Sequence, residues 1–143
     1  MIVLRCGQAP VPPVLGEHAR LECGAVPTRD EAERVRRELE VGGRVLVCGT
    51  DAALAALLTR FLRTERLDVE FAYVAAEPTP ATRAYGLPTG SAAARLGVDG
   101  DARELPLVRD ETGTALVGEA VVTGPAGETL VGEAYADDDR VFL

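Results

Sequence analysis

The chain has 143 residues, a hydrophobic fraction of 47% and a formal net charge of -8 at pH 7. A chain of this length fits one ordinary domain with a real core, and its acidic balance excludes a general nucleic-acid binder, which needs clustered basic residues. All fifteen Lys-or-Arg positions hold Arg, so Schiff-base and P-loop chemistry that depends on Lys is excluded as well.

The first part of the chain has the pattern of short strands followed by a helix. An apolar run at residues 2–4 predicts a first strand, and residues 21–23 are the candidate for a second short strand. Thr28 and Glu31 have the spacing of a capping box, and they predict a helix over residues 28–40 that ends at a pair of glycines.

The middle of the chain continues this alternation. An uninterrupted apolar run at residues 45–47 is typical of a strand buried on both faces of a parallel sheet. The helix predicted over residues 51–63 is apolar almost all round, so we expect it to be largely buried. Alternation over residues 69–73 predicts another strand, and a short helix over residues 90–96 ends at Gly97. The fold class predicted is α/β, a parallel-type sheet with flanking helices.

After residue 103 the pattern becomes that of an antiparallel β-meander. Glycine-containing turn signals separate short apolar runs, which is typical of consecutive hairpins. The strands expected are residues 105–108, 115–122, 129–135 and 141–143.

Two glycine-bearing turns each lead into a predicted helix, and they are the candidate binding elements. A strand that runs through a small-residue turn into a helix presents free backbone N–H groups to a phosphate. In the plain alternative, the threonines are ordinary N-caps and the glycines serve the turns. The residues concerned are Gly49 and Thr50 in the first turn, and Thr89, Gly90 and Ser91 in the second.

Charged residues near these turns allow two interpretations. Arg44 and Arg95 are the most plausible basic partners of an anion, and each could equally be an ordinary surface arginine. Asp51 could hold Mg²⁺ beside a phosphate, or it could cap the helix that it begins. Residues 1–66 hold ten Arg against nine acids, a net of +1, whereas residues 67–143 hold five Arg against fourteen acids, a net of -9. We therefore expect an anionic ligand to contact the first half.

The cysteines and acids indicate no metal site. Cys6, Cys23 and Cys48 lack C-x-x-C spacing, and we expect reduced, partly buried thiols. The acidic run at residues 137–139 lacks the spacing of a calcium loop and predicts a solvated turn. Signal-peptide features and an apolar run of about 18 residues are both missing, which predicts a cytoplasmic protein without a membrane span.

The two turns and the order of elements over about residues 1–123 resemble the N-terminal domain of the diacylglycerol kinase and NAD kinase superfamily. That family has a glycine-rich strand-to-helix turn, a later Thr-Gly-containing loop that opens a helix, and then an antiparallel β-domain. Gly49 matches the first turn. The second loop is matched by Thr89, Gly90, Ala94, Arg95, Leu96 and Gly97, with Ser91 and Ala92 where the family has Asn and Asp.

This resemblance implies an α/β Rossmann-like nucleotide-binding-type domain over residues 1–103 and an antiparallel β extension over residues 104–143. The replaced Asn and Asp imply a degenerate, truncated member that binds a nucleotide or phosphometabolite without catalysis. Two alternatives stay open: a homodimeric structural module without ligand, and an active ATP-dependent lipid or NAD kinase. In the active kinase, ATP with Mg²⁺ would be the cofactor and Asp51 the catalytic acid, with Gly49, Thr50, Thr89, Gly90, Ser91 and Arg95 around the nucleotide.

Overall fold

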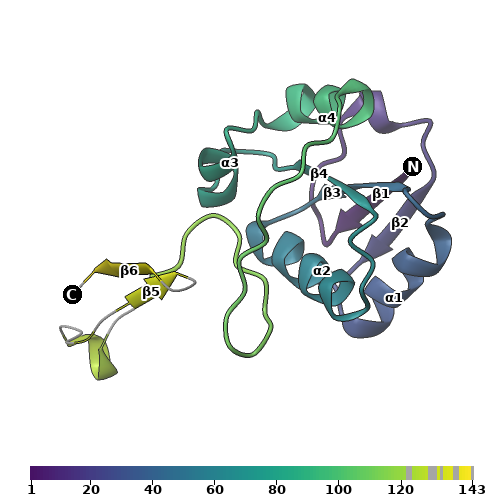
Figure 1. The fold of residues 1–143 in the computed structure, drawn as a ribbon. Helices are drawn as coiled ribbons and strands as arrows, with labels where there is room; N and C mark the ends of the chain where they lie inside the picture. Colours follow the sequence, from purple (N-terminus) through teal and green to yellow (C-terminus); the bar gives the residue numbers. More distant parts are fainter. Residues whose placement is uncertain (122–123, 129–131, 133, 137–138, 143) are drawn as a thin grey trace.

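A computed structural model describes residues 1–121, 124–128, 132, 134–136 and 139–142. Its body is a parallel sheet with helices on both faces (Figure 1). The elements in chain order are β1 (Ile2–Cys6), η1 (Pro13–Leu15), β2 (Arg20–Cys23), α1 (Arg29–Glu38), β3 (Arg44–Cys48), α2 (Asp51–Arg63), β4 (Glu70–Val74), α3 (Pro80–Tyr85), α4 (Gly90–Asp99), η2 (Pro125–Gly127), β5 (Ala134–Ala136) and β6 (Asp139–Phe142).

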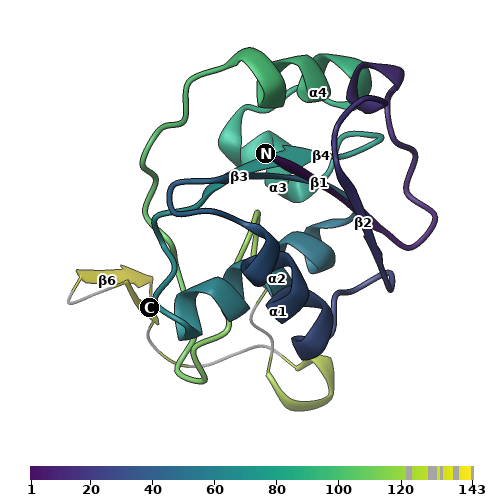
Figure 2. The same cartoon turned by 90° about the vertical axis from the view of Figure 1, so that its right-hand side faces the viewer.

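The sheet has the strand order β2-β1-β3-β4, and all three pairings are parallel. This confirms the predicted α/β class. The chain crosses one face of the sheet between β1 and β2, and the other face through α1 and α2 (Figure 2). The direction of winding therefore reverses between β1 and β3. Ligands of open α/β sheets bind beyond the carboxyl ends of the strands, at such a reversal point.

Successive residues of β3 pack against different helices, as a strand buried on both faces requires. Val45 and Val47 belong to the cluster that contains the buried residues of α1 and α2. Leu46 and Cys48 face the opposite way, in the cluster that holds η1 and α4. Each of the four side chains is completely buried. The sheet is thus the middle of three layers, and the two glycine turns begin helices on opposite faces.

The predicted helix starts are confirmed. Thr28 caps α1 with its side chain, and the reciprocal bond from Thr28 N to the Glu31 carboxylate, 2.8 Å long, completes the capping box. Helix α2 covers the predicted range, with the Thr50 side chain accepting from Ala53 N.

The predicted end of α4 is wrong, because the helix continues through Gly97 to Asp99. A Cβ atom at position 97 would lie 2.9 Å from Ala72 Cβ and 3.1 Å from Leu46 Cδ2. The glycine therefore lets α4 approach the sheet closely. A stop signal and a close-packing glycine look alike in sequence.

The β-meander expected after residue 103 differs from the structure. Within the described part, residues 105–121 form one isolated bridge, between Arg109 and Ala115, instead of two strands. Ala115 N donates to Thr59 Oγ1 at 2.8 Å, and the Arg63 side chain donates to the Thr112 carbonyl at 3.0 Å. These two backbone groups are therefore bonded to side chains of α2 and not to a neighbouring strand.

One antiparallel pair, β5 with β6, forms near the end of the described chain. Of the predicted strands, residues 122, 129–131, 133 and 143 lie outside the described residues, and so do residues 137 and 138 of the acidic run. The division into two domains at residue 103 stays a prediction.

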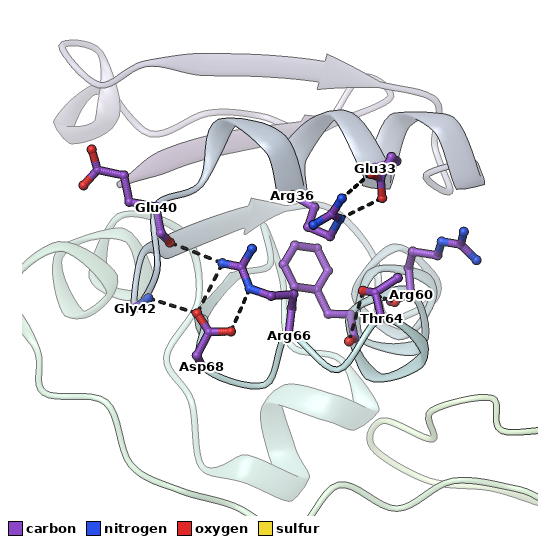
Figure 3. Close-up of polar contacts among 9 residues, drawn as sticks. Glu33, Arg36, Glu40, Gly42, Arg60, Thr64, Arg66 and Asp68 are labelled. Atoms are coloured by element: carbon purple, nitrogen blue, oxygen red, sulfur yellow. Dashed lines mark hydrogen bonds and ion pairs between the residues drawn. The ribbon is translucent and has the colours of Figure 1, made fainter.

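Several arginines of the first half are engaged in ion pairs and loop contacts at the amino edge of the sheet (Figure 3). Arg66 Nε donates to Asp68 Oδ1 at 2.7 Å, and Gly42 N donates to the other carboxylate oxygen at 3.0 Å. The Arg66 and Gly42 hydrogen bonds lower the pKa of Asp68 to about 2. Arg36 pairs in the same way with Glu33 on α1. Arg66 and Asp68 connect the loops before β3 and β4, because Arg66 also donates to the Glu40 carbonyl, whereas the Arg36–Glu33 pair lies within α1.

Candidate functional site

The first glycine turn follows β3 and is closely packed. A Cβ atom on Gly49 would lie 2.9 Å from Cys6 Cβ and 3.2 Å from Ala53 Cβ, so only glycine fits without a shift of its neighbours. Thr50, the N-cap of α2, accepts from Ala53 N at 3.3 Å. These contacts give both residues a structural role: Gly49 permits the close packing of the turn, and Thr50 caps the helix.

Asp51 is held by two other elements. Its Oδ1 accepts a hydrogen bond of 2.8 Å from the Tyr73 hydroxyl, and its Oδ2 accepts one of 3.1 Å from Ala81 N at the start of α3. The Tyr73 hydroxyl also lies 3.3 Å from the Gly49 carbonyl oxygen. Burial, with the adjacent Asp51 carboxylate, raises the pKa of Tyr73. Asp51 therefore joins the starts of α2 and α3 to β4.

The second turn is more open. Gly90 has φ +57°, a left-handed conformation that favours glycine, and its N–H donates to the Ala75 carbonyl at 2.7 Å. Thr89 is the N-cap of α4, but its side chain makes no capping hydrogen bond with the described residues. Ser91 and Ala92, the next residues of the helix, are exposed. Helix α4 thus begins without the side-chain acceptor that α1, α2 and α3 have.

The two turns lie at the same edge of the sheet but not in the same pocket. Cys48 and Val74 are register partners at the ends of β3 and β4, so the turns follow neighbouring strand ends. Helices α2 and α4, however, cover opposite faces (Figure 2).

A pocket of about 250 Å³ opens at this carboxyl edge, beside α4. One wall is the proline-rich loop after β1, the floor is the end of β4, and the first turn of α4 closes the third side. Its lining residues do not include Gly49, Thr50 or Asp51. The residues that line it are Pro10, Val11, Pro12, Pro13, Val74, Ala75, Ala76, Gly90 and Ser91.

The two arginines proposed as anion partners lie in different places. Arg44 begins β3 at the amino edge, where it donates to Glu70 Oε2 at 2.6 Å and to the Gly97 carbonyl at 2.8 Å. It is thus on the wrong edge of the sheet for either turn. Arg95 is exposed on α4, four residues after Ser91, and residues at this spacing share a helix face. Arg95 is not a lining residue of the pocket, but it shares a helix face with Ser91, which is one.

The geometry of Asp51 does not fit a Mg²⁺ site. Its two oxygens are turned toward Tyr73 and α3, and the described residues contain no group of three or more His, Cys, Asp or Glu that could hold a metal ion. Mg²⁺ in nucleotide sites is bound by carboxylates together with the substrate phosphates, and no carboxylate is among the described residues that line the pocket beside α4. Among the described residues, the lining of this pocket presents a helix start to an anion and contains no acidic side chain.

A larger, shallower hollow of about 570 Å³ lies at the other edge, between the end of α2 and the turn at residues 110–113. Its charged lining residues are Arg63, Glu65, Arg109 and Glu111, which balance one another. It lies away from the carboxyl ends of the strands and contains none of the sequence-predicted residues. We therefore consider the pocket beside α4 the stronger candidate.

Sequence reasoning missed three parts of this region. It did not identify Tyr73 as the partner of Asp51, the proline-rich loop as a pocket wall, or α3 as a helix. The Thr79 and Thr82 side chains form a capping box at the start of α3, with Pro80 in its first turn, and this pattern could have predicted the helix.

Comparisons with known proteins add no relative. Among the described residues, no helix is long and apolar enough to cross a membrane. No family model, no curated protein and no solved structure matches the chain.

Proposed function

We propose that the chain is a noncatalytic binding domain for a small phosphorylated ligand, a nucleotide or a phosphometabolite, built on a scaffold like that of the diacylglycerol kinase and NAD kinase superfamily. The observation that carries the proposal is the pocket at the carboxyl edge of the parallel sheet, which includes the first turn of α4. Such crevices are where open α/β sheets bind ligands.

The pocket offers separate places for a charged and an apolar group. The Gly90 N–H is bonded to the Ala75 carbonyl, so the helix dipole and the N–H groups that follow it, from Ser91 onward, are what the start of α4 directs toward an anion, with Arg95 one turn further along. The opposite wall, at residues 10–13, consists of three prolines and a valine, which suit a ring or an alkyl group. A phosphate attached to a compact apolar or planar group matches both walls.

The size of the pocket restricts the ligand. A volume of about 250 Å³ is below the range of about 300–1,000 Å³ that is usual for drug-sized ligands. A whole nucleoside triphosphate would extend into solvent, so we expect a phosphorylated metabolite or one end of a nucleotide to bind. Absence of catalysis is part of the proposal, because Asp51 is bonded to Tyr73 and Ala81 and is not a lining residue.

The test is calorimetry and thermal shift with ATP, ADP, NAD, inorganic phosphate and pyrophosphate, each with and without Mg²⁺. A ligand of the native state raises the melting temperature by mass action, so a binder should shift it in proportion to its concentration over its Kd. Ser91→Tyr would place a ring in the pocket and should abolish binding. The matched control is Ala92→Tyr, at the exposed neighbour that does not line the pocket.

The outcomes are distinct. Binding lost in Ser91→Tyr and kept in Ala92→Tyr supports the site. If no compound binds at millimolar concentration, or if both variants bind like the wild type, the proposal fails. Transfer of labelled phosphate from ATP to lipid or NAD would instead favour the active-kinase alternative.

A second candidate function is self-association, and one observation favours it. The segment that follows α4 carries exposed large apolar side chains, with Leu105 62% and Val121 79% exposed and Val108 and Leu116 between them in sequence. Where such side chains form a contiguous patch, they are typical of interaction surfaces. A second copy of the chain is the occupant that this alternative proposes, and sedimentation at micromolar concentration tests it: a monomer excludes a stable homodimer.

A further inference from the structure

Two of the three cysteines lie side by side at the carboxyl ends of neighbouring strands. Cys6 ends β1 and Cys23 ends β2, and the two residues are register partners in the parallel ladder. Their Sγ atoms lie 3.5 Å apart, and both thiols are free. Cys48 is also free, but it faces the other side of the sheet, in the cluster around η1 and α4.

The backbone geometry is compatible with a covalent bond between this pair. Neighbouring strands lie about 4.7–4.9 Å apart, within the Cα separation of about 4.4–6.8 Å that disulfides span. A disulfide has an S–S distance of about 2.05 Å, so the sulfur atoms need to approach by about 1.5 Å. Rotation of the two side chains can supply much of that movement, since the strands are already paired.

We propose that Cys6 and Cys23 are a reversible oxidation site, which a hydroperoxide or a small-molecule disulfide converts to an intramolecular disulfide. Cys23 is half-buried and is the thiol that an oxidant can reach, whereas Cys6 is 4% exposed. The oxidant in solution therefore reacts first with Cys23, and Cys6 is the resolving thiol.

With hydrogen peroxide the chemistry balances in two steps. The Cys23 thiolate attacks one peroxide oxygen, the O–O bond breaks, and after proton transfer the products are a sulfenic acid and water. Cys6 then attacks the Cys23 sulfur, the S–O bond breaks, and a second water leaves as the S–S bond forms. Two thiols and one peroxide thus give one disulfide and two waters, and the sulfur atoms lose two electrons in total. A small thiol reverses the step by exchange.

The surroundings make this oxidation slow at neutral pH and faster at alkaline pH. Burial raises the pKa of Cys23, Glu31 adds to the rise, and the hydrogen bond with Cys6 and the nearby Arg34 oppose it. Burial also raises the pKa of Cys6, with contributions from Cys23, Cys48 and Glu31. Because the thiolate is the reactive form, the rate should increase as the pH approaches the pKa of Cys23.

The disulfide would restrain the carboxyl ends of β1 and β2, beside the point between β1 and β3 where the winding reverses. It would close the loop that contains η1 and would fix edge strand β2 to β1, next to the existing bond from Gly7 N to the Cys23 carbonyl. Cys6 also lies beside the first glycine turn, where a Cβ atom on Gly49 would be 3.3 Å from the Cys6 sulfur. Because a disulfide constrains the unfolded chain, the cross-link should raise the melting temperature by several degrees.

The experiment treats the folded 143-residue chain with hydrogen peroxide, or with diamide as a second oxidant, and measures the intact mass and the cross-linked peptides. We expect a loss of two hydrogens, a peptide that joins Cys6 to Cys23, and full recovery with dithiothreitol. Cys48→Ser should behave like the wild type, while Cys23→Ser should form no intramolecular bond. Circular dichroism of each variant before oxidation shows that it is folded.

Three results would overturn the proposal: accumulation of sulfinic acid on Cys23 without a cross-link, a disulfide that includes Cys48, or a Cys6–Cys23 bond that forms only in denaturant. The ligand titrations described above are done on the reduced protein, so failure of the binding proposal leaves this one intact.

Discussion

Tyr73 and Asp51 are joined by a hydrogen bond of 2.8 Å from the phenol hydroxyl to the carboxylate oxygen Oδ1. The tyrosine comes from β4 and the aspartate from the first turn of α2, so the bond connects a strand to the helix that precedes it in sequence. Asp51 also accepts from Ala81 N, which extends the connection to α3. The carboxylate therefore organises three elements at the carboxyl edge.

Tyr73→Phe should destabilise the fold by about 1.5–3 kcal/mol, the usual contribution of a hydrogen bond to a charged group. The aromatic ring stays buried in the variant, so the change in stability reports the loss of the hydroxyl group alone. Urea denaturation measures the free energy of unfolding. The matched control is Tyr85→Phe, whose hydroxyl makes no hydrogen bond within the described residues; it should change stability by about 0.5 kcal/mol or less. Equal effects of the two substitutions would contradict the role of the Tyr73 bond.

The protein should lose stability in alkali, and Cys48 should account for part of the loss. Burial raises the pKa of its thiol from 9.0 to about 11. A group whose pKa is higher in the folded state stabilises fully below its unfolded pKa, and this contribution disappears as the pH rises through the folded value. The decrease attributable to Cys48 should therefore occur between about pH 9 and pH 11.

Urea midpoints measured at intervals from pH 8 to pH 11 test this, under a reducing agent. Cys48→Ala should lower stability at pH 8, because it leaves a small cavity, but it should flatten the curve over the alkaline range. A wild-type curve and a Cys48→Ala curve that run parallel throughout would rule the contribution out.

The sheet and its main helices could be predicted from the sequence because local signals decide them. The run at residues 45–47 indicated a two-faced strand, and the capping box at Thr28 fixed the start of α1. Gly97 shows where this reasoning fails. Its meaning depends on Ala72, which is close in space but distant in sequence.

The site was less predictable for the same reason. The sequence indicates that the turns at Gly49 and Gly90 each lead into a helix. The face of the sheet that each helix covers depends on the crossover connections, and α2 and α4 cover opposite faces. The pairing of Asp51 with Tyr73 depends on the β3–β4 register. Cys23 ends the strand predicted over residues 21–23, but Cys6 lies two residues beyond the strand predicted over residues 2–4. Only the observed extension of β1 to Cys6 and the parallel register make the two cysteines neighbours.

Gly90→Ala should cost about 1–2 kcal/mol through backbone strain alone. Position 90 has φ +57°, and an added Cβ would meet only the Ala76 carbonyl oxygen, at 4.0 Å. Gly90→Asn should cost less, because Asn tolerates the left-handed region better. The control is Gly24→Ala, where φ is not positive and the nearest atom is 3.6 Å away. Chemical denaturation compares the three; a Gly90→Ala variant as stable as the wild type would contradict the strain argument.

Gly97→Ala tests the close approach of α4 to the sheet. Helix propensity favours Ala by about 0.8–1.0 kcal/mol, but a Cβ at 2.9 Å from Ala72 Cβ overpacks the interface, which typically costs about 1–3 kcal/mol. We expect a net loss of about 1 kcal/mol. Ala72→Gly removes the clashing methyl and destabilises β4 by about 0.5–1 kcal/mol. If the two positions compete for one space, the double variant is more stable than the sum of the single changes predicts, by about 1–2 kcal/mol. Additivity within about 0.5 kcal/mol in urea denaturation would show that α4 relaxes away from the sheet instead.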